Sequence, residues 1–127
     1  MIKRSGLIAN PSATQVITAV TRWGSESSIG VTIPANIVGV SVDHVFVIGF
    51  NTCLKSATGR FSISHLLGDC YNGLEVTSAV DNHYVDDVRF EPVYGLNVSS
   101  ISGAWARPGI AFNLHDGNTG GVQTQRI

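Results

Sequence analysis

The chain has 127 residues, a formal net charge of −1 and 13% charged residues, about half of the roughly 25% found in an ordinary soluble domain. This weak charge excludes the basic field of a nucleic-acid-binding or membrane-surface protein. The length predicts a single domain that can bury a core without a metal or a disulfide. Because few charges accompany 43% hydrophobic residues, we expect part of the surface to be covered by copies of the chain or by a partner.

The beginning of the chain lacks hydrophobic periodicity and contains the turn pair Asn10-Pro11. We therefore expect an extended N-terminal arm at residues 1–14, followed by a single β domain at residues 15–127. Segments of alternating polar and apolar residues predict strands at 14–23, 29–34, 38–50, 61–66, 74–80, 83–90, 93–98, 109–114 and 122–127. Residues 51–60 are predicted to be a loop. No segment has clear helical spacing, and no internal repeat is apparent.

Short strands separated by turn signals every 8–12 residues or so indicate an all-β fold. We expect an antiparallel two-sheet sandwich, jelly-roll-like or barrel-like. The longest strand is predicted at 38–50, VGVSVDHVFVIGF, where the row from Val38 to Phe50 is apolar except for His44. This row is expected to face the core. The opposite row, with Val45 and Val47, is expected to be covered by a neighbouring element or subunit.

His44 and His65 each lie in an otherwise apolar row. The simplest interpretation is a hydrogen-bonded imidazole in the core. The alternative is that the two histidines meet across strands, or meet their own copies at a symmetry axis, which would create a site sensitive to pH near neutrality. Asp43 precedes His44, but neighbouring residues of a strand point to opposite faces, so these two are not expected to pair.

The densest charged segment is DNHYVDD at 81–87. Oxygen groups with one imidazole could hold Ca²⁺ or Mg²⁺, and the weak candidate ligands are Asp81, His83 and Asp87. A hydrolase hypothesis uses the same residues, with Asp86 as a further carboxylate. A solvated strand edge, kept charged against edge-to-edge pairing, is the commoner reason for such a run. We therefore predict no metal, no cofactor and no catalytic residue.

The segment HDGNTGG at 115–121 has the composition of a tight hairpin turn. The alternative is a carbohydrate site, where short polar side chains bind sugar hydroxyls beside an aromatic ring. Its candidate residues are Asp116, Asn118, Trp105 and Tyr84. An indole near a strand end can cap a core or enter an interface, and the interface candidates are Val45, Val47, His44, Trp23 and Trp105.

Cys53 and Cys70 cannot build a four-ligand zinc site alone, so we expect buried free thiols. A disulfide would require an oxidising compartment. The start MIKRSGL is followed by an apolar run that is too short for a signal peptide. No segment approaches the ~20 apolar residues of a membrane span. We therefore expect folding in a cytoplasm, without contact with a membrane.

A short, charge-poor chain that is rich in glycine and valine and begins MIKRSG resembles the small structural proteins of tailed-bacteriophage virions. These are capsid decoration (cement) proteins and the β-rich domains of fibres and spikes, and the resemblance lies in whole-chain character without a motif. It implies a non-catalytic virion protein, made in the host cytoplasm, that forms a homo-oligomer, with a trimer favoured. Its partner would be a capsid or tail protein, and the short N-terminal region favours decoration over a complete fibre. The alternative is a carbohydrate- or cell-surface-binding β-sandwich module, and a His/Asp hydrolase ranks below both.

Overall fold

The computed structural model describes the chain except for residues 59, 78–82, 97, 99–106, 115–121 and 126–127. The described residues form α1 (Ala13–Ser25) and the strands β1 (Ile2–Lys3), β2 (Ile29–Ile33), β3 (Val38–Ile48), β4 (Thr52–Ser56), β5 (Arg60–Asp69), β6 (Asn72–Val76), β7 (His83–Phe90), β8 (Phe112–Leu114) and β9 (Val122–Gln125). Sheet A has the order β1-β3-β5-β7-β9, and sheet B has the order β2-β4-β6-β8. Among these residues, no helix has the length and apolar character needed to cross a membrane.

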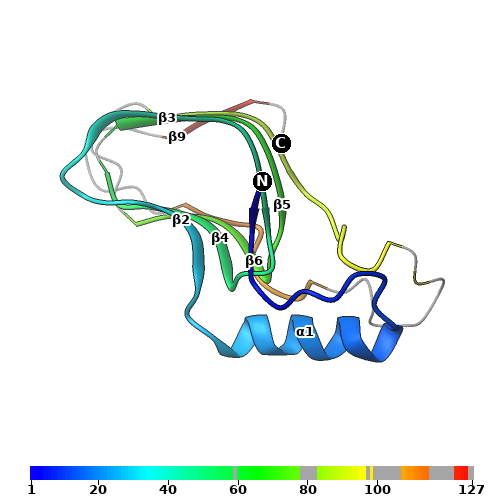
Figure 1. Cartoon of the computed structure of the whole chain (residues 1–127). Coiled ribbons are helices and arrows are strands. Elements are labelled where there is room, and N and C mark those ends of the chain that lie inside the picture. Colours follow the sequence, from blue (N-terminus) through cyan, green and yellow to red (C-terminus); the bar gives the residue numbers. More distant parts are fainter. Residues whose placement is uncertain (59, 78–82, 97, 99–106, 115–121, 126–127) are drawn as a thin grey trace.

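All neighbouring strands in both sheets are parallel, because the chain alternates between the sheets from β2 onward (Figure 1). One strand of sheet B and the next strand of sheet A make one coil of a solenoid. Each coil pairs in register with the next, so that Val42 lies beside Ile63 and Ile63 lies beside Val85. Inward side chains therefore stack coil upon coil and form one continuous core.

The expected antiparallel sandwich is wrong. Short strands and frequent turns are present, but each turn is a corner that leads to the other sheet instead of a hairpin that returns along the same one. Two segments also differ in type. The predicted loop at 51–60 contains β4, which lies in the middle of the core, and the described residues of 93–98 form turns.

The predicted strand at 14–23 is also wrong, since these residues form most of α1. Ser12 begins the helix with a capping box: its hydroxyl accepts from the Gln15 N–H at 3.3 Å, and the Gln15 side chain accepts from the Ser12 N–H at 2.8 Å. Val16, Val20 and Trp23 recur at helical spacing and are 0%, 5% and 0% exposed. The many β-branched residues of this segment favour a strand. Burial of the apolar helix face nevertheless stabilises the helical conformation.

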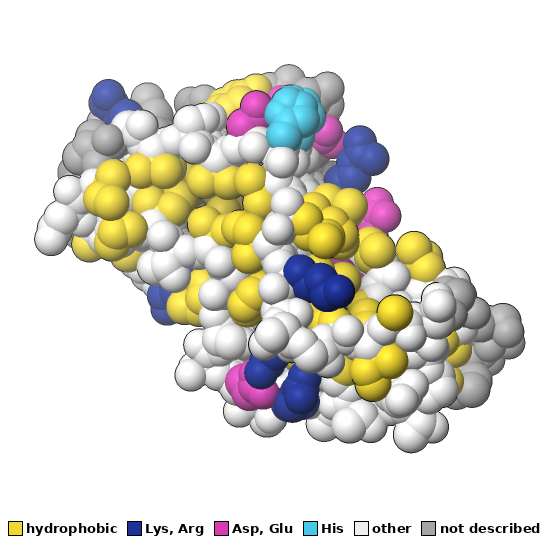
Figure 2. Space-filling view, viewed as in Figure 1, with side chains coloured by type: hydrophobic (Ala, Val, Ile, Leu, Met, Phe, Trp, Pro, Cys, Tyr) yellow, Lys and Arg dark blue, Asp and Glu magenta, His cyan; other side chains and the backbone are white. Residues whose placement is uncertain are grey.

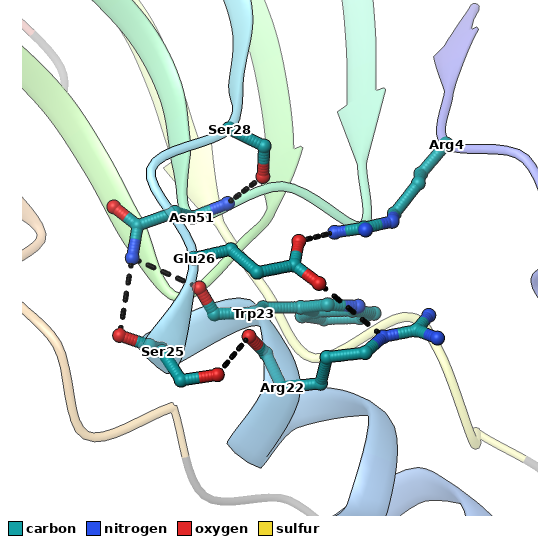
Figure 3. Close-up of polar contacts among 8 residues, drawn as sticks. Arg4, Arg22, Trp23, Ser25, Glu26, Ser28 and Asn51 are labelled. Carbon is teal, nitrogen blue, oxygen red and sulfur yellow. Dashed lines mark hydrogen bonds and ion pairs between the residues drawn. The ribbon is translucent and has the colours of Figure 1, made fainter.

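Helix α1 packs beside the corners of the solenoid (Figure 1) and forms a second core there. The buried residues of this core are Ala13, Val16, Val20, Trp23, Ile48 and Tyr94. Asn51, in the corner between β3 and β4, donates from Nδ2 to the carbonyl oxygens of Trp23 at 2.9 Å and Gly24 at 3.4 Å (Figure 3). The end of the helix is thus hydrogen-bonded to the first corner.

The start of the chain is also attached to this region. Glu26, just after α1, binds Arg4 and Arg22, the latter at 3.7 Å (Figure 3). The hydrogen bond from Arg4 lowers the pKa of Glu26. Residues 1–14, predicted as an extended arm, therefore contribute β1 to sheet A, and Leu7 and Ala13 to the second core.

A buried carboxylate joins four parts of the chain. Asp69 ends β5 and accepts from Arg107 Nε at 2.6 Å, from Arg107 Nη2 at 3.1 Å and from the Tyr94 N–H at 2.5 Å. The Arg107 guanidinium also donates to the Tyr94 carbonyl at 3.1 Å and lies 5.6 Å from the centre of the Trp23 ring. The side chains of Asp69 and Arg107 are 0% and 12% exposed. The ion pair thus holds two segments against β5 and α1: the one after β7, which contains Tyr94, and the one before β8, which contains Arg107.

We expect Arg107→Ala to lower the free energy of unfolding by about 3–5 kcal/mol, because it leaves the Asp69 carboxylate buried without its cation. Urea unfolding followed by circular dichroism measures the change. Arg89→Ala, at an exposed position of β7, is the control and should change stability by no more than about 0.5 kcal/mol. Equal midpoints for the two variants would contradict the role given to the pair.

Cys53 and Cys70 are free and buried, which confirms the sequence prediction. Their sulfur atoms lie 3.9 and 3.8 Å from the carbonyl oxygen of Val47. Burial raises the pKa of the Cys53 thiol strongly, and the neighbouring Cys70 thiol raises it further.

Both thiols should therefore resist a thiol reagent such as Ellman's reagent at pH 8 in the folded protein, since both are buried and the raised pKa of Cys53 also suppresses its reactive thiolate. In denaturing urea, both should react at once. Stopped-flow absorbance with and without urea measures the ratio of rates. Rapid labelling of either cysteine in the folded chain would contradict this placement.

Candidate functional site

A left-handed backbone residue recurs at the same position in successive coils of sheet A. His44, His65 and Asp87 have φ angles of 53°, 51° and 48°. The registers of β3, β5 and β7 place the three residues side by side, at the bend of each strand. Positive φ is uncommon for residues other than glycine. Its repetition at His44, His65 and Asp87, which form a column across the sheet, therefore indicates a regular bend in sheet A and not a chance irregularity.

The bend changes which residues of β3 face the core. Val40 and Val42 pack inward before His44, whereas Val45 and Val47 pack inward after it. The prediction that one unbroken row faces the core is therefore wrong. Val47 is fully buried and Val45 is half-buried against the core, so neither lies on a second outer face as expected of interface residues.

Outside the bend, two imidazoles converge on one carboxylate. The Nδ1 atoms of His44 and His65 lie 2.8 Å from Asp43 Oδ2 and 2.9 Å from Asp43 Oδ1. The Ser64 hydroxyl donates to the same Oδ1 at 2.8 Å. The two rings stack with their centroids 4.3 Å apart and their planes at 19°. Contacts from His65, Ser64 and His44, in that order of size, hold the pKa of Asp43 well below its usual range.

Two sequence interpretations of these residues are wrong and one is confirmed. The imidazoles are not in the core, because the side chains of His44 and His65 are 72% and 43% exposed; Figure 2 shows histidine at the surface beside acidic groups. Asp43 and His44 do pair, because the left-handed residue interrupts the strand alternation. The alternative that the two histidines meet across strands is confirmed.

The charged surface continues onto β7. Arg89 Nε donates to Asp87 Oδ1 at 3.1 Å, and Asp87 Oδ2 lies 4.0 Å from His65 Nε2. A shallow recess of about 200 Å³ lies here, lined by His65, Leu66, Leu67, Asp87, Arg89 and Glu91. Among the residues described, the histidine and carboxylate side chains that gather at ligand distances are Asp43, His44 and His65, beside this recess.

The other predicted site residues are not brought together by the described structure. Trp23 is fully buried in the second core, which agrees with the core role considered for it and not with the interface role. Tyr84, on β7, is 41% exposed, and Asp86 is buried. His83 begins β7. Asp81, Trp105, Asp116 and Asn118 lie outside the described residues.

A second recess, of about 260 Å³, lies at the corner between β5 and β6. Its lining includes Asp69 and Arg107 together with the aromatic rings of Tyr71 and Phe90. The charged pair in it is engaged in holding the fold. The recess therefore offers mainly apolar surface.

The column of left-handed residues is marked in the sequence by a short recurring motif. VDHV at 42–45, ISHL at 63–66 and VDDV at 85–88 share one pattern: an apolar residue, two polar residues and another apolar residue. The register aligns all three motifs. They are the internal repeat of the solenoid, and the two central polar residues of each motif mark its bend.

Comparison of the chain with protein-family models, with curated proteins and with solved structures finds no match. The function is therefore inferred from the arrangement of this chain's own residues.

The left-handed bend can be tested at its most exposed residue. We expect His44→Val to be less stable than His44→Asn by about 1–2 kcal/mol, because asparagine accepts positive φ and a β-branched residue does not. Both variants lose the imidazole, so the difference reports the backbone alone. Urea unfolding of the two proteins measures it, and equal stability would mean that residue 44 is not left-handed.

Proposed function

We propose that this chain is a non-catalytic structural subunit that assembles with copies of itself and joins a larger partner through its first coil, β2 and β3. The observation that carries the proposal is the exposure of apolar side chains at that end of the solenoid. A closed, solitary domain would cover them.

The exposure follows from comparing equivalent positions in successive coils. Leu54 and Ile63, in the second coil, are fully buried. Val31 and Val42 lie beside them in the first coil and are only partly buried. In the view along the stack, hydrophobic side chains gather over the sheets (Figure 2). The interior of the first coil thus meets solvent in the isolated chain.

The first coil also exposes unpaired backbone groups that could hydrogen-bond to a strand of another chain. Strand β2 is an edge strand of sheet B, and the outer side of β3 pairs with β1 only at Val47 and Ile48. Parallel edges present rows of N–H and C=O groups that can pair with another chain, and charged residues normally protect them. β2 has no charged residue, and β3 has Asp43 alone apart from His44. Terminal coils of a solenoid otherwise need a polar cap.

The finer assignment rests on sequence character. A tailed-phage virion protein of the decoration type, with three copies and a capsid or tail protein as its partner, agrees with the low charge of the chain. Binding of a shell or tail protein to the open first coil of this chain would rest on many weak contacts and would require no catalytic group. This assignment extends the assembly proposal and is not required by it.

Assembly is tested by measuring absolute mass with light scattering behind a sizing column. We expect the wild type at a multiple of 13.5 kDa and Val42→Lys at or near the monomer, because the lysine places a charge in the apolar contact. Thr18→Lys is the control: this side chain is exposed on α1, outside the proposed contact, so its mass should equal that of the wild type.

Circular dichroism melting confirms that each variant is folded. Val31→Lys, on the other sheet of the same coil, gives a second test should Val42→Lys unfold. A wild type that stays at 13.5 kDa up to its solubility limit would contradict self-assembly.

A further inference from the structure

We propose that Asp43, His44 and His65 form a binding site for a divalent transition-metal ion of the zinc type. The site lies within one chain, so this inference goes beyond the proposed assembly and does not depend on it.

The donor atoms are already near the spacing that an ion requires. One ligand atom from each of the three residues lies within 4.8 Å of the other two. The two nitrogen–oxygen distances are 2.8 and 2.9 Å, while ligands held about 2.0–2.2 Å from one zinc ion lie about 3.0–3.5 Å apart. The stacked imidazoles are exposed, and rotation of their rings to direct both Nδ1 lone pairs to one point would admit an ion between the two Nδ1 atoms and the carboxylate.

The backbone and its neighbours hold these ligands in place before an ion arrives. Left-handed residues in two adjacent coils direct His44 and His65 to the same side, where their rings stack. Ser64 donates to the Asp43 carboxylate and fixes its orientation. Asp87 Oδ2 lies 4.0 Å from the far nitrogen of His65, on the side from which a carboxylate can support a metal-bound imidazole once it moves into hydrogen-bond distance.

The ligand types select the class of ion. Imidazole suits zinc, copper, nickel and iron, whereas Ca²⁺ and Mg²⁺ prefer oxygen ligands alone. The exposure of His44 and His65 leaves the remaining coordination positions open to water or to another molecule. The weak metal candidates predicted from the sequence, Asp81, His83 and Asp87, supply none of these three ligands.

The proposal is tested by calorimetric titration of ZnCl₂ into the full chain, prepared without a tag and freed of metal by chelation. We expect one zinc ion per chain. Asp43→Asn and His65→Asn should each weaken binding by at least about 10-fold, and asparagine at residue 65 keeps the left-handed backbone. Glu75→Gln, an acidic residue of sheet B paired with Lys55, is the control and should bind as the wild type does.

A second measurement needs no variant. In imidazole ¹H–¹⁵N spectra of the wild type, zinc should shift the signals of His44 and His65 and leave those of the other two of the four histidines unchanged. Absence of saturable binding would overturn the proposal. Binding undiminished in both ligand variants, or shifts at the other two histidines alone, would also overturn it, because the ion would then be held elsewhere.

Discussion

The in-register stacking of parallel strands is the constraint on which the rest of this structure depends. Each inward side chain must fit directly beside its equivalents in the neighbouring coils, as Val42, Ile63 and Val85 do. The same rule governs the outer face, where a left-handed residue in one coil lies beside a left-handed residue in the next. Stacking of the His44 and His65 rings is therefore a consequence of backbone register, and so is the shared carboxylate between them.

Strand stacking alone does not hold the corners between the two sheets in place. Contacts with α1 and the Asp69–Arg107 ion pair do so. Helix α1 lies along the corners that follow β3, β5 and β7, where it contacts Ile48, Tyr71 and Tyr94. The Asp69 carboxylate and the Arg107 guanidinium lie beneath this contact and bind Tyr94 between them. An ion pair so well hydrogen-bonded tolerates its burial, since each charge and most of its hydrogen-bonding groups are satisfied. Strands thus define the coils, and the helix with this pair fixes their corners.

The sequence predicts much of the local structure and little of the topology. Alternation locates the strands at 29–34, 38–50 and 83–90 nearly at their observed bounds, because one face of each is buried. It cannot tell a corner from a hairpin, since both are short and polar, and so the parallel pairing was missed. For α1, the inward spacing of Val16, Val20 and Trp23 was present but was outweighed by β-branched neighbours. The histidines were paired correctly and placed on the wrong face, because one left-handed residue reverses the alternation that assigned them.

The position of α1 has a consequence for how such a chain can change in length. The helix covers the side of the solenoid and leaves the open end of the first coil uncovered, so the end of the stack is not sealed by an element that must be remade when a coil is added. The motifs VDHV, ISHL and VDDV show what one added unit contains. Duplication of a single coil would extend both sheets by one strand and repeat the bend on the outer face. Length is therefore a property that evolution or a protein engineer can vary by whole coils, and the side chains of each added bend would lie against those of the neighbouring bends, as His44 lies against His65.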